Sequence, residues 1–132
     1  MTGEEARDKT VAAELALADE CLAEARYALQ GGFHRLVRIR CYYACFHAAT
    51  AVFAQMGLAF RKHSGLLSAI DTQLVRPGKL PSEYTAIIRR LHESRLRSDY
   101  GDAAPVSASD AQQSLADAER VVTMLRRLLT GP

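Results

Sequence analysis

The chain has 132 residues, of which 48% are hydrophobic and 24% are charged. This length predicts one domain over residues 1–132, and the composition excludes disordered and collagen-like chains. No uncharged apolar run approaches the roughly 18 residues that a membrane span needs. The odd number of cysteines, three, and the lack of a charged-then-apolar leader favour reduced thiols in a cytoplasmic protein over a disulfide framework.

The net charge of +2 is distributed unevenly along the chain. Residues 1–32 carry −4, residues 33–97 carry +8 and residues 98–132 carry −2. A basic middle segment favours partners that bear phosphate, and the excess of 14 arginines over 3 lysines suits bidentate phosphate contacts. Two interpretations stay open: the segment binds such a partner, or the acidic outer segments pack against it and cancel its charge.

A first helix is predicted between Thr2 and Gly31. Thr2-Gly3-Glu4-Glu5 has the pattern of a capping box, and Gly31-Gly32 provides the left-handed residue that ends many helices. Between them, apolar residues recur at alternating spacings of four and three, which predicts one stripe facing a partner helix. The stripe consists of Val11, Leu15, Ala18, Leu22, Ala25 and Leu29.

A second helix is predicted from Phe33 to Met56, ending at Gly57. It is apolar on more than one side, so it is central to its bundle or lies in a dimer interface. One apolar face consists of Ile39, Tyr42, Phe46 and Phe53, and the other of Phe33, Leu36, Ala44 and Ala51.

Three further helices complete the prediction. A short one begins near Ser64 and ends before Pro77, a fourth runs from Pro81-Ser82-Glu83 to about Tyr100, and a fifth begins at Ser107 or Ser109. In no segment do apolar and polar residues alternate with period two over a useful length, so strands are not expected. We therefore predict an all-α fold, an antiparallel bundle of four longer helices and one short helix. The fifth helix should face inward with Ala111, Leu115, Ala118, Val122, Leu125 and Leu129.

The residue spacings argue against metal and cofactor sites. No glutamate is followed by histidine at the Glu-x-x-His spacing of di-iron bundles. Cys41, Cys45 and His47 cannot share one ion on a helix, because His47 points more than about 120° away from both cysteines. We interpret the two cysteines as small core residues, and we expect no metal and no cofactor.

Polar residues interrupt the apolar second helix at Arg40, Tyr43 and His47. Arg40 and His47 are two turns apart and project to within about 20° of each other, with Tyr43 between them. A functional interpretation is that the arginine clamps a phosphate while the histidine moves a proton. The alternative is a satisfied interior polar cluster.

Two further sites combine charge with a helix boundary or an apolar stripe. Arg61-Lys62-His63-Ser64-Gly65 places three basic residues before a helix start, which fits an anion site or a polar loop in which Ser64 caps the helix. On the fourth helix, the apolar stripe of 84, 87, 88 and 91 continues into His92, Arg95 and Asp99. This face is either a structural ion pair or a binding cleft.

These segments, in this order, resemble the HEPN family of small helical domains (higher eukaryote and prokaryote nucleotide-binding), in an uncharacterised prokaryotic branch. The resemblance covers nearly the whole chain. It rests on Arg40-Cys41-Tyr42-Tyr43-Ala44-Cys45-Phe46-His47-Ala48-Ala49, on Lys62-His63-Ser64-Gly65 and on Arg95-Leu96-Arg97-Ser98-Asp99-Tyr100.

The resemblance implies a homodimeric bundle, often encoded beside a minimal nucleotidyltransferase as a toxin–antitoxin or defence pair. Many members are metal-independent RNases with an arginine and a histidine four to six residues apart. Arg40 and His47 fit that spacing on an early helix, whereas the family motif lies late, where Arg95 has no matching histidine. The tyrosine that is adenylylated in some members would correspond to Tyr100.

Three hypotheses follow. In the first, the chain is a binding module for nucleotide or RNA that partners a nucleotidyltransferase, and Tyr43, Lys62, His63, Arg95 and Asp99 form its phosphate site. In the second, it is a ribonuclease toxin with Arg40 and His47 as catalytic residues. In the third, it is a structural dimerisation domain. The first two require the cations at positions 40, 62 and 95 to converge around one hollow.

Overall fold

The computed structural model describes residues 2–99 and 105–129, with the side chains of all of these except Ser98 and Asp99. Five α-helices and one π-helical segment follow each other along the chain, and no strand occurs in the described part. The elements are α1 (Gly3–Gln30), α2 (His34–Gln55), α3 (His63–Ala69), η1 (Ile70–Val75), α4 (Ser82–Asp99) and α5 (Ala108–Leu129). The predicted all-α fold of four longer helices and a short one is confirmed.

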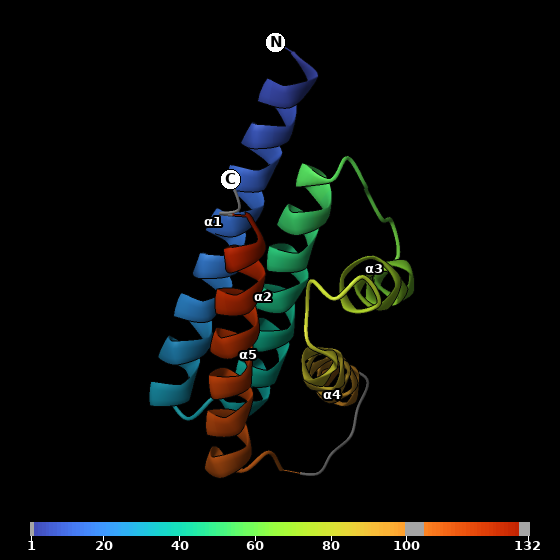
Figure 1. The fold of residues 1–132 in the computed structure, drawn as a ribbon. Helices are drawn as coiled ribbons and strands as arrows, with labels where there is room; N and C mark the ends of the chain where they lie inside the picture. The colour runs from blue at the N-terminus through green and yellow to red at the C-terminus, as the bar shows by residue number, and fades with distance from the viewer. Residues whose placement is uncertain (1, 100–104, 130–132) are drawn as a thin grey trace.

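The helices form two layers (Figure 1). α1, α2 and α5 run along one direction, with α1 antiparallel to α2 and α5 parallel to α2. α3 and α4 are seen almost end-on in the same view, so they cross this three-helix layer steeply. α2 packs against α1, α5 and α4, which makes it the central helix of the bundle.

The ends of α1 follow the sequence closely. The Thr2 hydroxyl accepts a hydrogen bond from the Glu5 amide while the Thr2 amide donates to the Glu5 carboxylate, so the predicted capping box is present. Gly32 has φ of +79°, and the Phe33 amide donates to the Ala28 carbonyl at 2.8 Å, which is the Schellman arrangement. A side chain at this positive φ would be strained, whereas glycine adopts it freely. Gly32 therefore allows the chain to reverse into α2.

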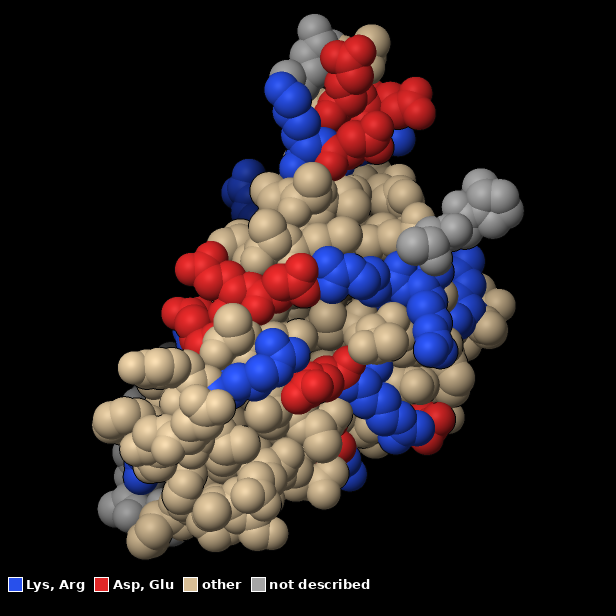
Figure 2. Space-filling view, turned by 90° about the vertical axis from the view of Figure 1, so that its left-hand side faces the viewer, with Lys and Arg blue, Asp and Glu red and all other residues tan. Residues whose placement is uncertain are grey.

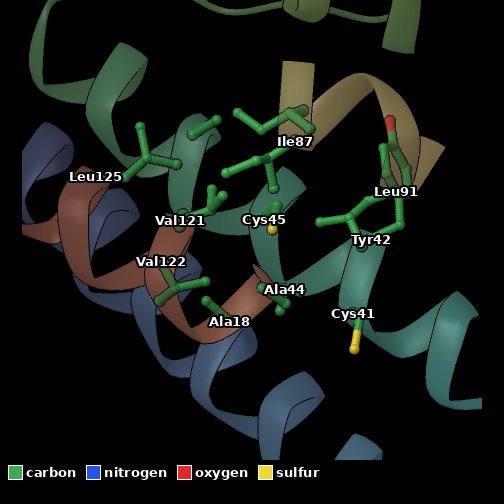
Figure 3. Packing of buried hydrophobic residues seen from close by; sticks show 14 of the residues in the cluster. Ala18, Cys41, Tyr42, Ala44, Cys45, Ile87, Leu91, Val121, Val122 and Leu125 are labelled. Atoms are coloured by element: carbon green, nitrogen blue, oxygen red, sulfur yellow. The ribbon is translucent and has the colours of Figure 1, made fainter. Parts of the chain in front are cut away.

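The core consists largely of small and branched side chains, and α2 contributes more of them than any other helix (Figure 3). Ala44 and Cys45 lie among Ile87 and Leu91 of α4 and the valines of α5, and both cysteines predicted to be core residues are at most 1% exposed. Small residues let three helices approach α2 closely. Of the residues predicted to face inward on α5, Leu129 is only half-buried, and the other five are buried.

Two features differ from the prediction. The short helix begins at His63 and continues into η1, where the Arg76 amide donates to the Asp71 carbonyl five residues earlier. At the start of α2, Phe33 and Leu36 are exposed although they belong to one of the predicted apolar faces. The residues at positions 44 and 51 of that face are buried, because α1 and α5 cover α2 there.

Candidate functional site

Two arginines from different helices flank the ring of Tyr43. The guanidinium carbon of Arg40 lies 5.2 Å from the ring centroid, and that of Arg95 lies 5.5 Å from it. Arg40 belongs to α2 and Arg95 to α4, so the crossing of these helices joins cations that are far apart in the sequence. Both distances are within the range of cation–π contacts. Two of the three cations expected to converge therefore do so.

His63 joins the same cluster from α3. Nδ1 of His63 lies 2.6 Å from the hydroxyl of Tyr42, and its ring stacks on Phe46 with centroids 4.5 Å apart. The ring of Tyr43 is 5.9 Å from that of His63. Lys62, the third expected cation, is exposed and precedes His63 at the start of α3. Of the predicted Lys-His pair, His63 thus lies beside the tyrosine pair.

Arg40 and His47 are both held by carboxylates of α1. Nη1 of Arg40 lies 3.5 Å from Glu24, and Nδ1 of His47 lies 2.7 Å from Oε2 of Glu14. The ring of Tyr43 lies between them, 6.4 Å from that of His47. Arg40, Tyr43 and His47 therefore lie along one side of α2, as predicted. The acidic residues of α1 compensate the basic groups of this set in part.

His92 is part of the cluster although it was not among the predicted site residues. Its ring centroid is 5.0 Å from Tyr42 and 6.2 Å from His63. Desolvation lowers the pKa of both histidines, and the positive charge of Arg95 lowers these pKa values further. Both imidazoles are therefore predominantly neutral at pH 7.

Tyr42 occupies the centre of the cluster and is 1% exposed. Burial raises the pKa of its phenol, so the hydroxyl stays protonated and can hydrogen-bond to His63. Arg95 lies 5.3 Å from this ring and is itself only 7% exposed. A buried arginine packed against two tyrosine rings indicates a built site rather than a solvated surface charge.

Two predicted residues cannot be placed fully. Asp99 is the last residue of α4, and its side chain lies outside the described part. Tyr100, the expected modification site, also lies outside the described residues. Their assignments remain predictions.

Sequence reasoning missed four residues of this cluster. Tyr42 and Phe46 were assigned to an apolar face, and Glu14 gave no signal, because its contact with His47 depends on how α1 packs on α2. His92 had a usable signal. It lies one turn before Arg95, on the stripe that changes from apolar to charged.

The acidic outer segments do pair with the basic middle segment. Besides the two contacts to α1, Arg38 lies 3.6 Å from Asp110 and Arg90 lies 3.4 Å from Asp117 of α5. Figure 2 shows acidic and basic side chains interleaved across the middle of one face. Part of the basic charge is therefore cancelled within the chain.

The described residues contain no group of three or more His, Cys, Asp or Glu side chains suited to a metal ion. Burial raises the pKa of the Cys41 thiol to about 12, and the pKa of Cys45 is also raised, so neither forms a thiolate at neutral pH. In the described residues, no helix is long and apolar enough to cross a membrane.

Comparison with known proteins identifies the class of this helical domain. The model of the HEPN domain family matches residues 13–128, so the chain belongs to the HEPN family. It is similar to a UPF0332 protein of Thermotoga maritima, with 32% identity over 85% of each chain. It is also similar to a "Putative toxin" of Methanocaldococcus jannaschii, with 27% identity over 90% of this chain and 88% of that protein. The expected family resemblance is confirmed.

Proposed function

We propose that this protein is a toxin-like HEPN module that binds nucleotide or RNA at the cluster around Tyr43. The single observation that carries the proposal is the convergence of Arg40 and Arg95 on one aromatic ring. Guanidinium groups bind phosphate, and bases stack on guanidinium planes as well as on aromatic side chains. His63 belongs to the same cluster, Lys62 precedes it at the start of α3, and Asp99 ends the helix that carries Arg95. The similarity to the archaeal "Putative toxin" supports the toxin-like part.

The test is binding of single-stranded RNA to the purified protein at low salt, with EDTA present. The double variant Arg40→Gln/Arg95→Gln should lose most of the affinity. The matched control Arg76→Gln/Arg120→Gln removes two charges from exposed ion pairs with Asp71 and Glu83, and it should keep the affinity. Equal losses in both double variants would show non-specific attraction only, and no binding by the unmodified protein would reject the function.

The proposed assembly is a homodimer that partners a minimal nucleotidyltransferase in the cytoplasm, where free thiols such as its three buried cysteines stay reduced. An uncharged surface covers the end of the molecule where α1 meets α2 (Figure 2). Its exposed large side chains include Tyr27 at 75%, Phe33 at 61% and Leu36 at 44%. Contiguous apolar surface of this kind marks protein contacts. Light scattering of Phe33→Glu against the unmodified protein tests the dimer, and co-purification with the neighbouring gene product tests the partner.

A second candidate function, a metal-independent ribonuclease, is favoured by the contact between Glu14 and His47. A carboxylate 2.7 Å from Nδ1 orients the imidazole and leaves Nε2 as the nitrogen that can exchange a proton with substrate. Arg40, two turns away on the same helix, would stabilise the developing negative charge on phosphorus. RNA cleavage in EDTA that leaves cyclic-phosphate ends, and that is lost in Arg40→Ala and in His47→Ala, would establish this activity. Cleavage that survives in both variants would exclude it.

A further inference from the structure

Two histidines and one arginine surround the ring of Tyr42. The Tyr42 hydroxyl lies 2.6 Å from Nδ1 of His63, and the ring centroid of His92 lies 5.0 Å from that of Tyr42. The two imidazoles are nearly parallel, at 21°, with centroids 6.2 Å apart. Arg95 follows His92 by one helical turn and lies 5.3 Å from the Tyr42 ring. Three elements, α2, α3 and α4, thus place two titratable rings and one permanent cation together.

The members of this group lie at different depths. His63 and His92 are half-buried, whereas Arg95 and Tyr42 are buried. A ligand that approaches from solvent therefore meets the imidazoles first, with the guanidinium charge behind them. Because the surroundings of Arg95 are poor in water, its charge acts on such a ligand with little screening.

The hydroxyl of Tyr42 can support either protonation state of His63. A phenol donates to Nδ1 of a neutral imidazole, and after rotation of its proton it accepts from Nδ1 of an imidazolium. In both states Nε2, on the far side of the ring from Nδ1, can carry a proton and donate to an anion. His63 can therefore gain a proton without losing its anchor on α2.

The charges around the two histidines disfavour protonation while no anion is bound. Desolvation and then Arg95 lower the pKa of His63, and the same two causes, followed by His63 and Arg89, lower that of His92. Glu93 acts in the opposite direction and raises the pKa of His92. The rings of Tyr42, Tyr43 and Phe46 also face His63.

A doubly charged anion would reverse this balance more strongly than a singly charged one. A phosphate monoester carries a charge between about −1.5 and −2 at pH 7, whereas an internal phosphodiester carries about −1. The nearer the ligand charge is to −2, the more it favours two imidazolium rings beside Arg95. The group is therefore matched to a terminal phosphate rather than to the phosphates within an RNA strand.

We propose that His63 and His92, backed by Arg95, form a receptor for a phosphate monoester, the end group of a nucleotide or of an RNA strand, and take up protons when it binds. This inference rests on the proposed function, since it names the ligand class of the same site. It adds His92 as a specificity-determining residue.

The experiment compares matched ligands by calorimetry at low salt with EDTA. The probes are adenosine and uridine 5′-monophosphates against the corresponding 3′,5′-cyclic monophosphates, which differ in the number of ester bonds on phosphorus. Octaribonucleotides with a 5′-phosphate, a 3′-phosphate or hydroxyl ends then distinguish free nucleotide from either strand end. We expect monoester ends to bind at least about tenfold more tightly than diesters at pH 6.5. Repeating the titration in buffers of different ionisation enthalpy should show proton uptake between about 0.5 and 2 per ligand at pH 7.

The variants separate this receptor from general attraction. His92→Gln should lose most of the preference for the monoester and part of the proton uptake. His34→Gln is the matched control, because His34 binds the Val106 carbonyl at the start of α2 and lies outside the cluster. Melting temperatures monitor folding, and His63→Gln provides an independent variant if His92→Gln does not fold.

The outcomes distinguish a failure of the phosphate receptor from a failure of the proposed nucleotide or RNA binding. Equal affinity for monoester and diester ends, or binding without proton uptake, would overturn the receptor while leaving RNA binding in place. No binding of any probe would overturn the proposed function itself. A monoester preference that is unchanged in both His92→Gln and His63→Gln would place the phosphate elsewhere.

Discussion

The two arginines beside Tyr43 differ in how deeply they are buried and in the described groups around them. On the α1 side, Arg40 faces Glu24 and His47 faces Glu14, so each basic group has a carboxylate from the first helix. On the α4 side, Arg95 is buried against two tyrosine rings, and its neighbours include two imidazoles with lowered pKa values. The two arginines beside one ring thus lie in different surroundings, and Arg95 is the more deeply buried of the two.

The largest expected effect separates the two arginines. Arg95→Gln should weaken RNA binding about thirtyfold, or about 2 kcal/mol, because the guanidinium acts from a buried position. Arg40→Gln should weaken it only about threefold, since Glu24 already offsets part of the charge. Fluorescence anisotropy at low salt measures both. Equal losses in the two variants would contradict the difference between the two sides.

The hydroxyl groups of Tyr42 and Tyr43 should contribute differently to the free energy of unfolding. Tyr42→Phe takes away the partner of His63 Nδ1 within a buried cluster, so we expect a loss of about 1 kcal/mol in the free energy of unfolding. Tyr43→Phe keeps the ring between the two arginines and should change that free energy by less than about 0.5 kcal/mol. Urea unfolding measures both variants. The comparison fails if Tyr43→Phe is the more damaging substitution.

The free energy of unfolding should fall on acidification, and part of this fall should depend on His63 and His92. The folded-state pKa values of His63 and His92 lie below the ordinary value of 6.5, so the unfolded chain binds more protons as the pH falls below that value. Their contribution is fully present above pH 6.5 and is lost as the pH falls through the folded-state values. The double variant His63→Gln/His92→Gln should flatten the pH dependence of unfolding between about pH 5 and 6.5. A pH dependence that is the same in the double variant and in the unmodified protein would contradict this account.

The smallest expected effect concerns the carboxylate on the α1 side. Glu24→Gln removes the partner of Arg40 and should strengthen RNA binding about twofold, because the guanidinium then carries an uncompensated charge. Glu119→Gln, at an exposed ion pair with Arg26, is the control and should change the affinity less. Weaker binding in Glu24→Gln would mean that this carboxylate positions Arg40 rather than neutralising it.

The local signals in the sequence predicted most of the fold. The capping box at Thr2 and the glycines at 32 and 57 act through their own backbone neighbours, and the helices end where they predict. The π-helical turn of η1 was not predicted, because it depends on packing against α4 rather than on residue spacing. The exposure of Phe33 was missed for a similar reason, since periodicity identifies an apolar face without identifying what covers it.

The candidate site was predicted in part. Arg40, Tyr43 and His47 share a face because helical geometry fixes their spacing. Their meeting with Arg95 and His63 depends on the steep crossing of α4 over α2, which one-dimensional spacing does not encode. For the same reason, the sequence left Glu14 and Tyr42 outside the site, whereas His92 lies on the α4 stripe that the sequence marked as a possible cleft.

The most direct test of the central claim is a double-mutant cycle on Arg40 and Arg95 with RNA binding as the readout. If both arginines contact one ligand around Tyr43, the loss in the double variant will differ from the sum of the single losses by at least about 0.5 kcal/mol. If the two losses add within about 0.3 kcal/mol, the arginines act at separate places and the shared site does not exist.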